Sequence, residues 1–529
     1  MTPFFNAPLK VVRQKTMFSK LWRFIRQVVR KILPYKNIEA VEQVETPIST
    51  DMANALDDWY NMYINKAEWL SDTVKSLNLP AFISSELARQ IVLEMDWSIT
   101  GKTQDGETQE SDGSDVMNPR AEYLKTEFER CITVLRQKLE QGCAAGGMTI
   151  KPYPKDGHIY FDWTMDWSLY PIAFDDDGNM SDVIFRDTYI EGKTIYTRLE
   201  RHTVEGDNVK ITQRAFKSSS RDAIGLEIPL SDVEYWSQLQ PEATVKNTGG
   251  QMFGWYKVAS ANSIDVESPM GASCYCKARD TIKEADMQYS RLLWEYEGSE
   301  LAIDVDPTVL RPKKTEGGGL EMPKLNQRLF RAVDADKGDR DLYNVFSPTI
   351  RDGALINGLN QLLMRIEDQC GLARGTVSDA NTEARTATEL RIIKQRSYAT
   401  VADNQKALEH CLKDVIRAMD VYATLYNLAP EGEYEVSFEW DDSIITDTEQ
   451  QMQERMMLLN AGLISKAEFR EWYFNETKDQ AIAAVEAIAE EEAQAQMAGM
   501  SQLLPAVQTG QNPEQEPEEE QEPQGGPTD

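Results

Sequence analysis

The sequence is short of the side chains that most often do chemistry. Its 529 residues include only three histidines, and none has a partner at the spacing of a metal site. No G-x-S-x-G motif or other recognisable nucleophile arrangement occurs. We therefore expect no catalytic residue, no metal site and no cofactor. The histidines are His158, His202 and His410, and we expect His410 in the middle of a helix beside apolar positions.

A phosphate-binding loop for nucleotides is also missing. Two Gly-Lys-Thr runs, which begin at Gly101 and Gly192, superficially resemble the end of such a loop. The loop requires a further glycine five residues earlier, so that backbone amides can surround the phosphates. Asp96 and Asp187 occupy those positions. We predict a turn at each run and no nucleotide-binding residues.

Long hydrophobic runs and paired cysteine motifs are absent too. No stretch of about eighteen apolar residues occurs, so we expect no membrane span. The six cysteines show no C-x-x-C spacing, which favours buried, reduced thiols in a cytosolic setting. With 41% hydrophobic residues and a net charge of −31, the chain should fold as an acidic protein of roughly two to four domains. A tight DNA-binding protein is usually basic, so the charge argues against that class.

Positive charge is concentrated at the start of the chain, where the first acidic residue is Glu39. From Phe18 to Leu33, apolar residues form one face of a predicted helix and lysines and arginines the other. Such a basic amphipathic helix could lie on a membrane surface. It could equally dock on the acidic body of its own or a neighbouring subunit, and both alternatives stay open.

The segment 51–267 changes from helical to strand-like patterns. Its first part is mainly helical, and Asn118 and Pro119 are typical of a helix start. We expect that helix to end at Gly142. From 146 to 260, aromatic and β-branched runs alternate with turn residues, which predicts antiparallel hairpins.

Two predicted helices flank a segment in which hydrophobic residues show neither a sustained helical nor a sustained strand period. We expect the first at 271–296, followed by a strand at 301–305. Ser347 and Pro348 are typical of the cap and first position of the second helix. Gly371 should end it, because glycine adopts the left-handed cap conformation without a steric penalty.

A polar loop then precedes the longest predicted helix. Thr386 and Glu389 form a capping-box pattern, and apolar residues hold a helical period as far as Asn427. About forty residues at ~1.5 Å each make a rod of roughly 60 Å, which suits a part that spans a large assembly. A strand at 434–439, helices over 448–472 and a helix-prone stretch at 478–500 complete the pattern.

Five stretches of the chain resemble the portal proteins of tailed phages, most closely those of siphophages that infect Gram-positive bacteria. ARTATEL at 384–390 is similar to the tunnel-loop segment that opens the long helix of that family. The resemblance covers roughly residues 55–480 and keeps the family's order. The other stretches are SLNLPAFISSELARQIVLEM (76–95), DWSLYPIAFDDDGNMSDVIF (166–185), SPMGASCYCKARDTIKEADMQYSRLLWEYEGSE (268–300) and MLLNAGLISKAEFREWYF (457–474).

The resemblance implies an α+β, portal-like fold of long stem and channel helices, an antiparallel β-rich wing and a small clip. It divides the chain into a basic amphipathic N-terminal segment (1–50), the wing (51–267, β-rich over 146–260), the first stem helix (268–300), the clip (301–346), the second stem helix (347–371), the tunnel loop (372–385), the long helix with a wing strand (386–445), a C-terminal helical crown (446–504) and a disordered acidic tail (505–529).

The resemblance also implies the function. A portal protein is a non-enzymatic ring, dodecameric in the family, at one capsid vertex, through which double-stranded DNA is packaged and ejected. Implied partners are the terminase large subunit, which hydrolyses ATP, the head–tail connector or adaptor, the scaffold and the major capsid protein. The implied location is the virion, with assembly in the host cytoplasm. An acidic channel would keep the DNA polyanion from sticking.

Residue roles follow only from the resemblance. The tunnel loop would touch the phosphate backbone without reading bases, and the clip would meet its partners through basic residues. The tunnel-loop candidates are Arg374, Ser378, Asn381, Thr382 and Arg385, and the clip candidates are Lys313, Lys314, Lys324 and Arg328. From the residues alone, both segments are compatible with ordinary solvated surface.

Two other functions remain compatible with the sequence. A helical scaffold or assembly chaperone could bind partners through the long helix, and would form elongated dimers rather than closed rings. An NTP-driven motor subunit would have to bind nucleotide.

Overall fold

The computed structural model describes two units of the chain, which we call the body unit (residues 1–445) and the C-terminal unit (446–529). The structure is 47% helical and 24% strand, which confirms the α+β class. The predicted basic helix of the N-terminal segment and the acidic tail lie outside the described residues. These are 35–102, 118–220, 223–300, 349–379, 387–440, 448–474, 477, 478 and 480–489, with the backbone of short strands between 302 and 346.

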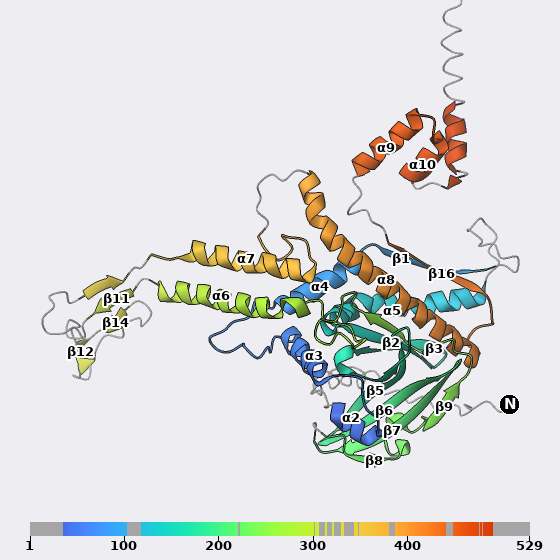
Figure 1. Cartoon of the computed structure of the whole chain (residues 1–529), viewed down its shortest axis with the longest axis horizontal. Coiled ribbons are helices and arrows are strands. Elements are labelled where there is room, and N and C mark those ends of the chain that lie inside the picture. Colours follow the sequence, from blue (N-terminus) through green and yellow to red (C-terminus); the bar gives the residue numbers. More distant parts are fainter. Residues whose placement is uncertain are drawn as a thin grey trace, which may run out of the picture. The chain divides into compact units, whose positions relative to one another are not determined.

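Helices α4 and α5 of the body unit pack against the long helix α8 (Figure 1). Leu408, Leu412 and Val415 on α8 are completely buried and join one large core with the other helices. Gly254 lets a strand approach α8 closely, because a Cβ there would collide with the backbone of Cys411. The helices are α2 (Tyr35–Glu42), α3 (Thr50–Tyr63), α4 (Leu79–Val92), α5 (Pro119–Ala145), α6 (Arg279–Gly298), α7 (Asp352–Cys370) and α8 (Ala387–Leu425).

Helix α5 starts where the sequence predicts and ends later. The side-chain oxygen of Asn118 accepts hydrogen bonds from two backbone N–H groups of the first turn. The prediction that Gly142 ends the helix is wrong, since Gly142 is buried inside it and the helix continues to Ala145. Gly146 is the cap, with a φ of 92°, and a Cβ there would lie 2.6 Å from the carbonyl oxygen of Gly271. Both the left-handed conformation and the close contact require glycine.

Strand β1 (Met95–Gly101) corrects the expectation of a mainly helical first part. It pairs antiparallel with β16 (Tyr434–Trp440) over its whole length, which confirms the strand predicted at 434–439. The ring of Trp97 on β1 meets that of Phe128 on α5 edge-on, with centroids 5.0 Å apart. A strand depends on its partner more than on its own propensity, and here the partner lies at the far end of the body unit's sequence.

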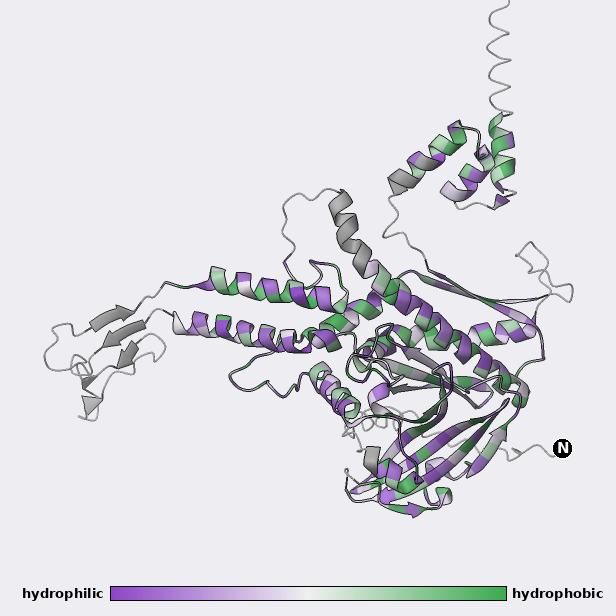
Figure 2. Cartoon of the chain, in the orientation of Figure 1, coloured by the Kyte–Doolittle hydropathy of each residue, from purple (hydrophilic) through white to green (hydrophobic). Residues whose placement is uncertain are grey.

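Two further antiparallel sheets confirm the predicted hairpins. The smaller, in the order β10-β2-β3, lies against α5 and α8, and the larger follows β4-β5-β6-β7-β8, with β9 on β7 (Figure 1). Hydrophobic and hydrophilic residues alternate along the larger sheet (Figure 2). The strands are β2 (Gly147–Lys155), β3 (His158–Met165), β4 (Leu169–Phe174), β5 (Met180–Glu191), β6 (Thr194–Glu205), β7 (Asn208–Ser218), β8 (Leu226–Ile228), β9 (Glu242–Val245) and β10 (Gly254–Lys257).

The two Gly-Lys-Thr runs begin in different structures. Gly192 has a φ of 61° in the tight turn that joins β5 to β6, as the sequence predicts. The prediction of a turn at Gly101 is wrong, because Gly101 is the last residue of β1 and pairs with Tyr434 of β16.

Helices α6 and α7 form an antiparallel hairpin, which we call the stem hairpin. The prediction that α6 starts near Gly271 is wrong, because the helix begins at Arg279 after a short 3-10 turn. The preceding residues instead cover the end of α5, where the N–H of Cys274 donates to the carbonyl of Cys143 over 3.0 Å. Tertiary hydrogen bonds therefore replace the first turns of the expected helix.

Helix α7 also begins later than expected and ends where expected. It starts at Asp352, so the helix start predicted at Pro348 is wrong, while Ser347 and Pro348 themselves lie outside the described residues. Gly371 ends it in the left-handed conformation, with a φ of 71°. Helix α8 follows from Ala387, next to the predicted capping box, and its 39 residues agree with the predicted length.

The described backbone between the stem helices includes five short strands. Strand β11 (Ala302–Val305) pairs with β15 (Tyr343–Phe346) antiparallel and with β14 (Phe330–Ala332) parallel. Strands β12 (Lys313–Lys314) and β13 (Leu320–Glu321) form a second pair. Because β11 follows α6 and β15 precedes α7, their pairing closes the outer end of the stem hairpin.

The C-terminal unit contains the helices predicted over 448–472. They are α9 (Thr448–Asn460) and α10 (Lys466–Phe474), and residues 480–489 are also helical. Ser465 and Glu468 cap α10 reciprocally, with the N–H of Glu468 donating to the Ser465 hydroxyl over 3.1 Å. Among the described residues of this unit, Ala481 is the one apolar side chain that is buried.

Candidate functional site

The loop that follows α7, described over residues 372–379, is held against α7 by one buried carboxylate. Glu367 is fully buried, and its carboxylate accepts hydrogen bonds from the N–H groups of Gly375, Val377 and Ser378. The Ser378 hydroxyl also donates to Glu367, over 2.8 Å. Leu372, 2% exposed, anchors the start of the loop in the core. A buried carboxylate needs such donors, so residues 372–379 have a defined conformation.

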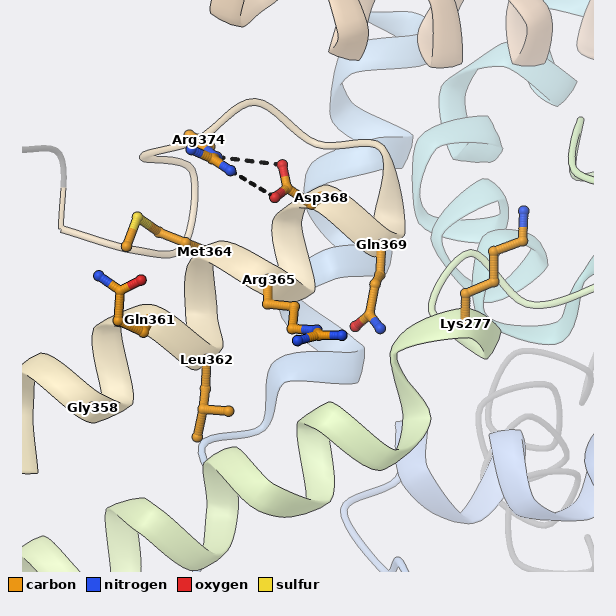
Figure 3. A pocket seen from close by; sticks show the side chains of 9 residues that line it. All are labelled: Lys277, Gly358, Gln361, Leu362, Met364, Arg365, Asp368, Gln369 and Arg374. Carbon is orange, nitrogen blue, oxygen red and sulfur yellow. Dashed lines mark hydrogen bonds and ion pairs between the residues drawn. The ribbon is translucent and has the colours of Figure 1, made fainter.

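Arg374 lies at the surface of this loop. Its guanidinium donates to both carboxylate oxygens of Asp368 on α7, over 2.8 and 3.3 Å (Figure 3). Donating these hydrogen bonds to the Asp368 carboxylate raises the pKa of Arg374. The side chain is 54% exposed, so the pair orients the cation without removing it from solvent.

An open pocket of about 860 Å³ lies beside the loop, between α7 and the start of α6. Three cationic residues line it, Lys277, Arg365 and Arg374, against the single acid Asp368. Figure 3 shows Arg365 and Gln369 projecting side by side from α7. The pocket is therefore locally basic in a chain of net charge −31.

The predicted site residues fall in different places. Arg374 lines the pocket, whereas Ser378 is 7% exposed and its hydroxyl donates a hydrogen bond to Glu367. Lys313 and Lys314 form strand β12. The remaining candidates, Asn381, Thr382, Arg385, Lys324 and Arg328, lie outside the described residues.

Sequence reasoning missed three residues of the site. Glu367 directly follows Ile366 of the apolar stripe, and a charge at that position is the signal that could have marked it as a buried acceptor. Arg365 and Lys277 carried no such signal. Arg365 lies on α7 itself, and Lys277 lines the same pocket only because the 3-10 turn before α6 packs against α7.

The histidines occupy three unrelated environments. His202 is buried and its Nε2 lies 2.8 Å from Glu200, while His158 lies 2.8 Å from Glu127. Burial lowers the pKa of His202, although Glu200 opposes this. His410 lies in the middle of α8 beside the buried Cys411, as predicted, and its side chain is 73% exposed, 3.5 Å from Asp414.

Within the described part of the chain, no cluster of three or more His, Cys, Asp or Glu residues could hold a metal ion. The same residues include no helix with the length and hydrophobicity to cross a membrane. All six cysteines are free thiols, and burial raises the pKa of Cys131, Cys143, Cys370 and Cys411.

Comparison with known proteins identifies the family to which the chain belongs. No curated protein matches the chain. The family model described as "Phage portal protein, SPP1 Gp6-like" matches residues 99–498, about three quarters of the chain. The match spans the larger sheet, the stem hairpin, the loop with its basic pocket, α8 and the C-terminal helices. The chain therefore belongs to the family of SPP1-like phage portal proteins.

Proposed function

We propose that this portal protein forms a closed dodecameric ring whose channel conducts double-stranded DNA during packaging and ejection. The family is structural and belongs to the virion, at the portal vertex of the capsid. The terminase large subunit and then the head–tail connector dock on the ring, which assembles in the host cytoplasm with scaffold and major capsid protein. The coarse domain plan of the resemblance, from wing to crown, is part of this proposal.

The observation that carries the proposal is the loop that follows α7. Its first half is fixed by Glu367, and its surface carries Arg374 beside the basic pocket. A few cations on an acidic protein suit transient phosphate contacts, because a strongly basic channel would bind DNA tightly and obstruct its movement. We propose that Arg374 and Arg385, with Asn381 and Thr382, contact passing DNA, and that Ser378 shapes the loop.

The clip is proposed as the docking site for terminase and connector. It joins the two stem helices through the β11–β15 pair, and its backbone carries Lys313 and Lys314 on β12. With Lys324 and Arg328, these residues would attract acidic partner surfaces and speed association more than they strengthen it.

The test is the double substitution Arg374→Ala and Arg385→Ala. Rings should form with wild-type stability, because exposed substitutions usually change stability by no more than about ±0.5 kcal/mol. DNA packaged per particle, measured by nuclease protection, should fall. The matched control is Arg89→Ala, since Arg89 is also a half-exposed arginine paired with a nearby acid, in its case Glu86. If the double variant retains wild-type DNA while the control behaves normally, the loop does not contact DNA.

A further inference from the structure

Helix α6 carries an exposed tryptophan near the outer end of the stem hairpin. Trp294 is 68% exposed, although tryptophan is usually well buried. Tyr296 on the same helix is 41% exposed. Exposed aromatic side chains of this size are enriched at protein interfaces, where they supply much of the binding energy.

The residue between them shows how the two aromatic side chains are arranged. Glu295 is almost fully buried, and its carboxylate accepts hydrogen bonds from the backbone N–H and the guanidinium of Arg351, which immediately precedes α7. Glu295 therefore points toward the α7 side. Successive residues of an α-helix are about 100° apart. Trp294 and Tyr296 consequently project from opposite flanks of the stem hairpin, at nearly the same distance along it.

The flank with Tyr296 carries a second aromatic side chain. Tyr289 lies two turns earlier on the same face of α6 and is half-buried. This flank thus presents two tyrosines along the helix. Trp294 and Tyr296 are 68% and 41% exposed, so both flanks are accessible at this point.

We propose that Trp294 of one copy packs against the Tyr289 and Tyr296 flank of the next copy, and that this contact repeats around the ring. We infer that the partner of each surface is a second copy of this chain, because the two surfaces differ and face opposite ways, as a head-to-tail contact requires. Trp294 and Tyr296 differ by only about 3 Å in their positions along α6. A neighbour related by rotation about an axis along the hairpin therefore meets them at the same height. The inference rests on the ring of the proposed function.

Cysteine cross-linking tests the pairing directly. Chains with Trp294→Cys and chains with Tyr296→Cys are purified separately, mixed during assembly and treated with a short bismaleimide. The mixture should yield covalent dimers, and neither variant alone should. The unsubstituted chain controls for the native thiols, of which only Cys274 and Cys276 are incompletely buried. Dimers from Trp294→Cys alone would indicate a two-fold contact and overturn the proposal.

A truncation measures how much the contact matters. Trp294→Ala should raise the protein concentration needed for half-maximal ring formation by about tenfold or more, as native mass spectrometry can measure. Val266→Ala, at an 86% exposed position in the body unit, is the matched control and should leave assembly unchanged. Thermal unfolding of monomers should be the same for both variants.

Two results separate this inference from the proposed function. If rings of Trp294→Ala form normally and Trp294→Cys stays reactive inside wild-type-like rings, Trp294 does not lie between subunits, although the ring itself stands. If the unsubstituted chain forms no ring at any concentration, both the proposed function and this inference fail.

Discussion

The body unit and the C-terminal unit both contain helices with apolar side chains, but they bury them to different extents. In the body unit, Phe128, Leu412 and Trp59 are at most 1% exposed and belong to one continuous core. Among the described residues of the C-terminal unit, Leu463 is 72% exposed and Met457 68% exposed. A core forms only where a second layer covers the apolar face, as α8 and the sheets do in the body unit.

The stem hairpin lies between these extremes. Its inner end is in the core through Ile366 and Ile282, both fully buried, while its outer end exposes Trp294. Along this single pair of helices, the inner end therefore contributes buried apolar surface to the core, and the outer end leaves apolar surface exposed for binding.

The largest effect should follow from emptying the core of the body unit. Phe128→Ala removes a ring that touches Trp97 on β1 and Phe438 on β16. We expect a loss of about 3–5 kcal/mol in the free energy of unfolding, measured by denaturant titration of the monomer. A loss below about 1 kcal/mol would show that the core of the body unit is less continuous than its burial indicates.

A comparably large effect should depend on pH. Asp166 is completely buried, and burial raises its pKa to about 7, although hydrogen bonding from Trp255 and the charge of Lys257 oppose the shift. The folded state therefore binds the proton more tightly than the unfolded state. Stability should fall as the pH rises from about 4 to about 7, by up to about 4 kcal/mol from this group.

The variant Asp166→Asn isolates this contribution. Its unfolding free energy, measured across the same pH range, should lack that part of the decline. Parallel pH profiles for variant and parent would contradict the assignment to Asp166.

A smaller loss of stability, confined to the loop after α7, is expected when the buried carboxylate of Glu367 is replaced. Glu367→Gln places an amide NH₂ group among backbone N–H donors and leaves some of them without an acceptor, which typically costs about 1–3 kcal/mol. Hydrogen exchange at residues 375–378 should accelerate. Asp368→Asn, which alters only the exposed partner of Arg374, is the control and should leave the exchange of these amides unchanged.

The smallest effect is expected in the C-terminal unit. Leu463→Ala at its exposed position should change monomer stability by no more than about ±0.5 kcal/mol. Thermal unfolding of the monomer measures this. A loss comparable to that of Phe128→Ala would mean that the unit has a core, and the contrast between the two units would disappear.

Sequence by itself determined the elements whose signals are local. The end of α7 at Gly371, the start of α5 at Asn118 and the length of α8 were predicted, because caps and helical periods depend on a few neighbouring residues. The antiparallel hairpins of the larger sheet were predicted for the same reason, since each turn joins strands adjacent in sequence.

The tertiary structure alone decided the features that depend on distant partners. Strand β1 exists because β16 pairs with it. Helix α6 begins at Arg279 because the preceding residues pack on the end of α5, where the backbone N–H of Cys274 donates a hydrogen bond to the carbonyl of Cys143. Lys277 and Arg365 line one pocket because the 3-10 turn before α6 packs against α7. Local patterns describe what one segment can form. Hydrogen bonds and charges shared between remote segments arise only when the chain has folded, because their partners are neighbours in space and not in sequence.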